Sequence, residues 1–128
     1  MDDVTTPLDK ASRDLAVLRR ARKRIAKPGN WCVKAMAVDQ RGHTVRFDDP
    51  SAVSWSVSGA LLRECGTFQQ AMGIYQEMGA MIAMPPDDIN EEYGHDAVIA
   101  LFDHAITLLE EKLEKQRSKS KTPVLVGL

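Results

Sequence analysis

The sequence predicts a mostly α-helical protein of the α+β class, with about four helices and a small β-hairpin between the first and second helix. Two observations lead to this fold class. Apolar residues recur at helical spacing in four segments, whereas residues 31–47 alternate between apolar and polar positions. Proline and glycine residues separate these segments. Because 128 residues are the length of one domain, we expect residues 1–121 to form a single helix-rich domain.

The first helix is predicted over residues 7–26. Pro7 suits the first helical position, and Pro28 followed by Gly29 ends the helix. Between these limits one apolar stripe includes Ala11, Leu15, Leu18 and Ile25. The next segment, residues 31–47, is predicted to be a β-hairpin in which Gly42 takes a positive φ at the turn. Its first strand is also compatible with a helix around residues 34–37.

The second helix is predicted to start at Asp49 and Pro50 and to close at Cys65-Gly66. It is apolar around most of its circumference, so we expect it to be the central and most buried helix. Its small residues would let neighbouring backbones approach closely, and its serine hydroxyls would bond back to the helix.

The third helix is predicted to start at the capping box formed by Thr67 and Gln70, and Pro85-Pro86 ends it. Residues 87–94 are predicted to be a polar loop, and the fourth helix to run from His95 to about Arg117. The apolar pattern stops at residue 113, so residues 114–121 are expected to protrude or fray. Residues 122–128 form an apolar C-terminal tail, expected to be disordered or to add a strand to a partner.

The net charge of −1 hides a strong asymmetry along the chain. Residues 1–27 carry 8 Lys/Arg against 4 Asp/Glu, residues 28–111 carry 4 against 13, and residues 112–128 carry 5 against 1. Such asymmetry indicates either a charged partner, or basic ends that pack near acidic surface of the same molecule or of a second copy. The acidic N-terminus and the lack of a long apolar run predict a cytoplasmic protein without a membrane partner.

The residue types that usually mark an active site do not form a pattern here. Cys32 and Cys65 lack metal-ligand spacing and are interpreted as small buried thiols, and the three histidines form no metal-binding pair. No Gly-x-Ser-x-Gly elbow or glycine-rich phosphate loop is present. We therefore expect no catalytic residue, no metal and no cofactor.

Two separated segments resemble one known family. The first reads Trp31-Cys32-x-x-Ala35-x-Ala37-x-Asp39-x-x-Gly42, and the second reads Ala52-x-x-Trp55-x-x-x-Gly59-Ala60-Leu61. Together they resemble the bacterial and phage family called domain of unknown function 6197, over roughly residues 31–106. Ile89-Asn90-Glu91 stands where that family has a Trp-Asn-Asp step, and Ser56 stands where it often has a cysteine. The resemblance implies no reaction, cofactor or partner.

Three clusters are the candidate sites. A basic run on the first helix could neutralise phosphates, and its residues are Arg19, Arg20, Arg22, Lys23, Arg24 and Lys27. A polar cluster near the start of the fourth helix contains Asn90, Glu91 and His95. A methionine cluster, interpreted first as core filler, could instead line an adaptable groove, and it comprises Met72, Met78, Met81 and Met84.

From these observations we expect a small non-enzymatic protein-interaction module of a bacterium, a phage or a mobile element. The hairpin edge and the methionine-containing third helix are the expected contacts, with another protein or with a second copy as partner. The first alternative is a nucleic-acid-binding accessory protein that uses the basic run. The second is an enzyme that works near the polar cluster.

Overall fold

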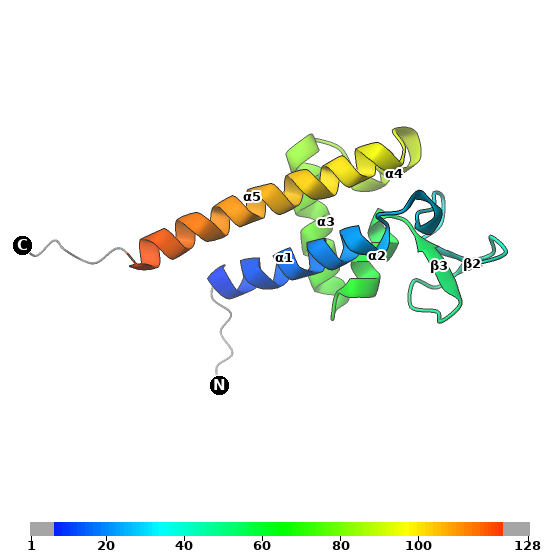
Figure 1. Cartoon of the computed structure of the whole chain (residues 1–128), viewed down its shortest axis with the longest axis horizontal. Coiled ribbons are helices and arrows are strands. Elements are labelled where there is room, and N and C mark those ends of the chain that lie inside the picture. Colours follow the sequence, from blue (N-terminus) through cyan, green and yellow to red (C-terminus); the bar gives the residue numbers. More distant parts are fainter. Residues whose placement is uncertain (1–6, 122–128) are drawn as a thin grey trace, which may run out of the picture.

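The computed structural model describes residues 7–121, and side chains within 9–118. In order, the elements are α1 (Pro7–Arg24), a single 3-10 turn (Pro28–Asn30), β1 (Ala37–Asp39), β2 (Thr44–Val45), β3 (Ala52–Trp55), α2 (Val57–Glu64), α3 (Phe68–Ile82), α4 (Pro86–Glu92) and α5 (His95–Lys121). Helices α1 and α5 lie side by side, and α3 crosses them (Figure 1). The small sheet lies at the end of the molecule opposite the C-terminal end of α5. The mostly helical α+β class is confirmed.

The first helix and the last helix form the long side of the core. The predicted stripe of α1 is buried from Ala11 to Ile25, and it packs with Val98, Phe102 and Ala105 of α5. Leu113 packs against Ala11 in a second small cluster. Beyond Leu113, α5 continues as a helix to Lys121, and most of its described side chains there are exposed.

The hairpin is confirmed, but it is part of a larger antiparallel sheet of order β2-β1-β3. Gly42 has the expected positive φ of 84°, and the Asp39 carboxylate accepts hydrogen bonds from the backbone N–H groups of Arg41 and His43. The first strand is shorter than predicted. It begins at Ala37, and Trp31 contributes only an isolated bridge to Trp55.

The predicted start of the second helix is wrong. Residues 52–55 form strand β3, and α2 begins only at Val57, where the Ser56 hydroxyl caps the helix by accepting from the N–H of Gly59 at 3.1 Å. Asp49 caps a turn instead, because its carboxylate accepts from the N–H of Ser51. Pairing with β1, which is distant in sequence, therefore overrides the local helix-start signal at residues 49 and 50.

The close approach of backbones expected around the second helix is confirmed at Gly59. A Cβ atom on this residue would lie 1.9 Å from the backbone oxygen of Met36. The same carbonyl accepts a hydrogen bond from the N–H of Ser56 at 3.1 Å. The segment before β1 is thereby held directly on the start of α2.

The third helix starts where predicted, since the Thr67 hydroxyl accepts from the N–H of Gln70 at 3.1 Å. The predicted loop at residues 87–94 is wrong, because Pro86–Glu92 form the short helix α4. Pro86 occupies its first position, Asp87 and Asp88 lie in its first turn, and Gly94, with φ of 89°, separates it from α5. The predicted tail at 122–128 lies outside the described residues.

Replacing Gly59 by alanine tests the close backbone contact. Gly59→Ala should destabilise the protein by more than about 3 kcal/mol, because backbone atoms have to move to admit the methyl group. Gly73→Ala is the matched control in α3, where a Cβ meets nothing within 4 Å, and it should stabilise by about 0.5–1 kcal/mol. Urea unfolding of both variants measures the difference. Equal stabilities would show that the Gly59 contact is absent.

Candidate functional site

Asn90, a member of the predicted polar cluster, is buried in α4 and hydrogen-bonded to three other groups of the chain. It is 1% exposed, and its Oδ1 accepts from the indole N–H of Trp31 at 2.7 Å and from the N–H of Val57 at 3.1 Å. Its Nδ2 donates to the carbonyl of Cys32 at 3.0 Å. The amide thus joins α4, the start of α2 and the segment before β1. With these three bonds made, Asn90 acts as a structural connection.

The other two members of the polar cluster separate. The imidazole Nε2 of His95 lies 2.7 Å from the carbonyl of Ile25, near the end of α1, and the ring lies 5.4 Å from the Trp31 ring. Glu91 is exposed and does not share these contacts. Asn90 and His95 therefore meet on Trp31, and no acid–base pair is assembled from the three residues.

The basic run of α1 is largely paired with acidic residues of the same chain. Glu64 accepts from Arg20 at 3.2 Å and from Arg24 at 2.5 Å. The run also contacts α5, through Arg19 to Glu110 and Arg22 to Asp103. The expectation that a basic end packs near acidic surface of the same molecule is confirmed for α1. Lys23 and Lys27 make no ion pair with the described residues.

Both cysteines are half-buried free thiols. Burial raises the pKa of Cys32, and burial together with the charge of Asp14 raises the pKa of Cys65 to about 11. A raised pKa leaves little thiolate near neutral pH, so neither sulfur is prepared for nucleophilic attack. Among the described residues, no group of His, Cys, Asp or Glu is arranged to hold a metal ion.

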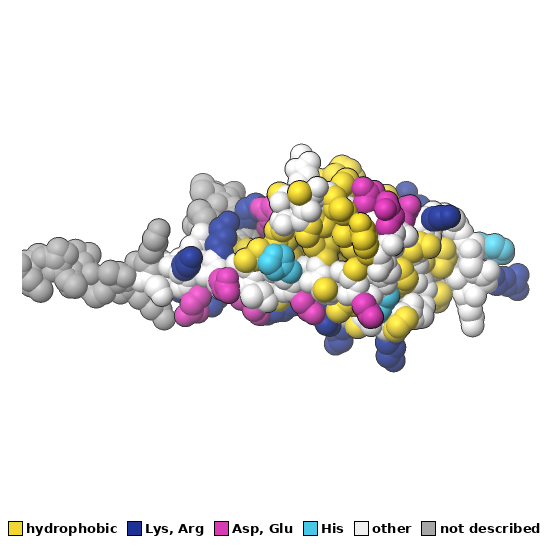
Figure 2. Space-filling view, turned by 90° about the horizontal axis from the view of Figure 1, so that it is seen from above, with side chains coloured by type: hydrophobic (Ala, Val, Ile, Leu, Met, Phe, Trp, Pro, Cys, Tyr) yellow, Lys and Arg dark blue, Asp and Glu magenta, His cyan; other side chains and the backbone are white. Residues whose placement is uncertain are grey.

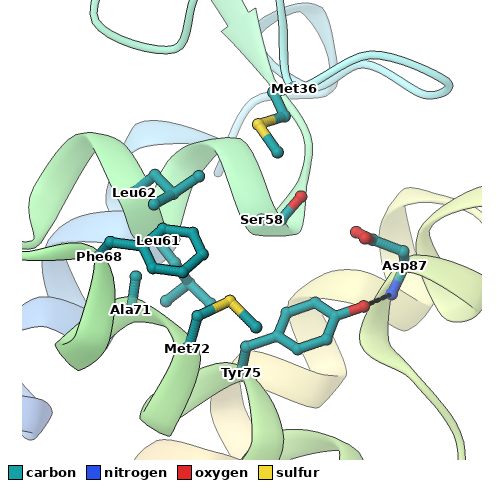
Figure 3. Close-up of a pocket in the computed structure, with 9 residues that line it drawn as sticks. All are labelled: Met36, Ser58, Leu61, Leu62, Phe68, Ala71, Met72, Tyr75 and Asp87. Atoms are coloured by element: carbon teal, nitrogen blue, oxygen red, sulfur yellow. Dashed lines mark hydrogen bonds between the residues drawn. The ribbon is translucent and has the colours of Figure 1, made fainter.

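An apolar groove lies between α2, α3 and the segment before β1. It encloses a cavity of about 260 Å³ (Figure 3). Its exposed edges are Phe68, which is 65% exposed, and Met36, which is 45% exposed. The residues that line it are Met36, Ser58, Leu61, Leu62, Phe68, Ala71, Met72, Tyr75 and Asp87. Most of these side chains are apolar, so the groove is a hydrophobic surface.

One end of the groove is polar and acidic. A neighbouring cavity of about 190 Å³ shares Met36, Ser58 and Asp87 with it, and adds Lys34, Ala35, Ser56, Asn90 and Glu91. At the junction, the N–H of Asp87 donates to the Tyr75 hydroxyl at 3.3 Å, as Figure 3 shows. Burial raises the pKa of Tyr75, so this hydroxyl stays neutral. Lys34 has a positive φ of 65°, an uncommon conformation for a residue with a side chain.

The surface around α5 is different in character. On the face shown in Figure 2, acidic and basic side chains lie along the length of the molecule, and hydrophobic side chains gather near its middle. Within the part of the chain that the structure describes, no helix is long and apolar enough to cross a membrane.

The sequence named some of the groove residues and missed others. Met72 lines the groove, as the alternative interpretation of the methionine cluster proposed, whereas Met78 is buried in the core. Phe68 shares its helical spacing with the buried Ala71 and Met78 of α3, yet most of its ring is exposed. Its position directly after the helix cap is the one local signal that separates it from the buried stripe.

Residues 9–108 match a family of unknown function (DUF6197). The chain belongs to this family. The match begins within α1, earlier than the motifs that carry the resemblance, so the DUF6197 unit includes the α1–α5 pair as well as the sheet. No curated protein and no solved structure matches the chain.

The hydrogen bonds of Asn90 give a testable stability prediction for this DUF6197 protein. Asn90→Ala should lower the free energy of unfolding by about 3 kcal/mol or more, because the indole N–H of Trp31 and two backbone groups lose their partners. Glu91 is the next residue and is exposed, so Glu91→Ala should change the free energy of unfolding by less than about 0.5 kcal/mol. Chemical denaturation measures both. Similar small effects would contradict the structural role of Asn90.

The thiol of Cys65 should react slowly with iodoacetamide. With a pKa of about 11 its reaction at pH 8 should be at least about ten-fold slower than that of free cysteine, whose pKa is about 8.5. The rate should rise with pH, because thiolate forms only as the pH approaches 11. Mass spectrometry of timed samples, with urea-unfolded protein as the control, gives the rates. Rapid labelling in the folded state would contradict the raised pKa.

Proposed function

We propose that this DUF6197 protein is a non-enzymatic, cytoplasmic protein-interaction module that binds an apolar peptide segment in the groove between α2 and α3. The observation that carries the proposal is the exposure of large hydrophobic side chains on a concave surface. Phe68 and Met36 stand at its edges, and Leu61, Leu62 and Ala71 form its floor. Concave apolar surface of this kind is typical of sites that take the apolar anchors of a partner.

The energetics of the groove favour a peptide. Burying the exposed part of the Phe68 ring under a partner would contribute about 1–2 kcal/mol. Met36 and Met72 have flexible, unbranched side chains that can adapt to different anchors. The cavity of about 260 Å³ is small for a cofactor and has room for a few aliphatic side chains.

The two alternatives receive less support from the same contacts. An enzyme working at Asn90, Glu91 and His95 would need polar groups that are available, and two of these residues are engaged in holding Trp31. A nucleic-acid interface on the basic run would have to draw its four arginines away from Glu64, Asp103 and Glu110, leaving Lys23 and Lys27 as the accessible cations.

Peptide binding tests the proposal. Apolar peptides selected from a random display library should bind the protein, and Phe68→Ala should weaken their binding at least about ten-fold, since an anchor contact is worth about 1.4 kcal/mol or more. Tyr93→Ala is the matched control, because Tyr93 is an exposed aromatic residue (59%) outside the groove. Fluorescence anisotropy of labelled peptides gives the affinities.

A labelled DNA duplex included in the same measurement distinguishes the nucleic-acid alternative. Tight duplex binding that Lys23→Glu abolishes and Phe68→Ala leaves intact would overturn the peptide-binding proposal. Selected peptides that bind the Phe68→Ala variant as well as the wild-type protein would show that the groove is not their site.

A further inference from the structure

The groove and the C-terminal segment of this chain have complementary chemistry. Residues 122–128 read Thr-Pro-Val-Leu-Val-Gly-Leu, with four aliphatic residues and no charge. Directly before them, the last turns of α5 carry Arg117, Lys119 and Lys121 in the sequence. A basic stretch is therefore followed at once by an apolar one.

The groove has the matching order of surfaces. Its floor is apolar, and its polar end is lined in part by Asp87, Asn90 and Glu91 of α4, a helix that also carries Asp88 and Glu92. Lys34 is the one cation among the residues that line the two cavities. A segment that runs from basic to apolar would thus place its positive charges at α4 and its aliphatic side chains against Leu62, Phe68 and Met72.

The segment does not reach the groove of its own chain. Helix α5 lines a cavity with α3 as far along the chain as Lys112, and from there to Lys121 it runs on for about 14 Å away from α3 (Figure 1). Seven extended residues span about 25 Å at most, so the return path along α5 alone uses more than half of that length. The groove is lined by residues of α2 and α3. Because α2 lies on the side of α3 away from the C-terminal end of α5 (Figure 1), the groove is farther from Lys121 than α3 itself.

We propose that residues 122–128 of one copy bind in the groove of a second copy. This inference rests on the proposed function of the groove, and it names the partner as the chain itself. Phe68 and Met72 receive the aliphatic residues, and the carboxylates of Asp87 and Glu91 face the basic residues that precede them. Because each copy carries one groove and one tail, reciprocal exchange closes a two-fold dimer.

Complementation between two variants of the full chain tests this exchange. Phe68→Glu disables the groove, and it is placed in the first turn of α3, where a carboxylate is tolerated by the helix. Leu125→Asp disables the tail. Each variant alone should self-associate at least about ten-fold more weakly than the wild-type chain in sedimentation velocity runs. An equimolar mixture should regain a one-to-one complex, since one copy supplies an intact tail and the other an intact groove.

The matched control is Gln69→Glu, which adds the same charge at the neighbouring exposed position outside the groove and should leave self-association unchanged. Circular dichroism confirms that each variant is folded. A wild-type chain that stays monomeric up to about 200 µM, where even weak specific dimers form, would overturn the inference. So would a mixture that fails to restore the complex.

The same variants separate this inference from the function on which it rests. If Leu125→Asp leaves self-association intact while selected peptides still require Phe68, the groove binds a different partner and only the tail assignment fails. If neither peptides nor the tail depend on Phe68, both proposals fail. Raising the salt concentration from about 50 mM to about 500 mM should weaken the wild-type complex, because it screens the contacts between basic tail and acidic α4.

Discussion

The fold depends on two contacts that hold the segment before β1 against the helices. One is made by the buried side-chain amide of Asn90, and the other is the close backbone contact at Gly59. Asn90 reaches from α4 to the indole of Trp31, the carbonyl of Cys32 and the N–H of Val57. A few residues later, the backbone of Met36 lies directly on Gly59, where no other residue leaves enough room. These two contacts fix the position of residues 31–36, and the Met36 side chain thereby becomes the upper edge of the groove. The shape of the groove is therefore a consequence of the core.

Local signals in the sequence were sufficient for the elements whose ends are set by their own side chains. Pro7, the Thr67 cap and the glycine at residue 42 predict α1, α3 and the hairpin turn, and each acts within a few residues. The predictions failed where a distant partner decides. Residues 52–55 form a strand because they pair with β1, and the local sequence pattern does not indicate this pairing. Helix α4 was missed because seven residues rich in acids resemble a loop.

The candidate site was less predictable than the fold, for a related reason. A groove is a property of the space between elements, and its lining comes from α2, α3, α4 and the segment before β1. The sequence could point only to single residues, as it did with Met72. Conversely, His95 and the arginines of the basic run are residue types common in functional sites, but here they contact other groups of the same chain. His95 contacts a backbone carbonyl, and the arginines form ion pairs with carboxylates. Long-range ion pairs of α1 with α2 and α5 account for much of the charge asymmetry that the sequence displays.

The motif that carries the resemblance to DUF6197 is explained mainly by architecture. Asp39 and Gly42 make the hairpin turn, Trp31 and Asn90 bind one another, and Gly59 admits a backbone. Most residues that line the groove, among them Phe68, Met72 and Asp87, lie outside the motif. A frame held by backbone contacts and buried hydrogen bonds tolerates changes in the exposed side chains beside it. In this chain the residues of the motif therefore account for the frame, whereas the chemistry of the groove is set largely by residues outside the motif.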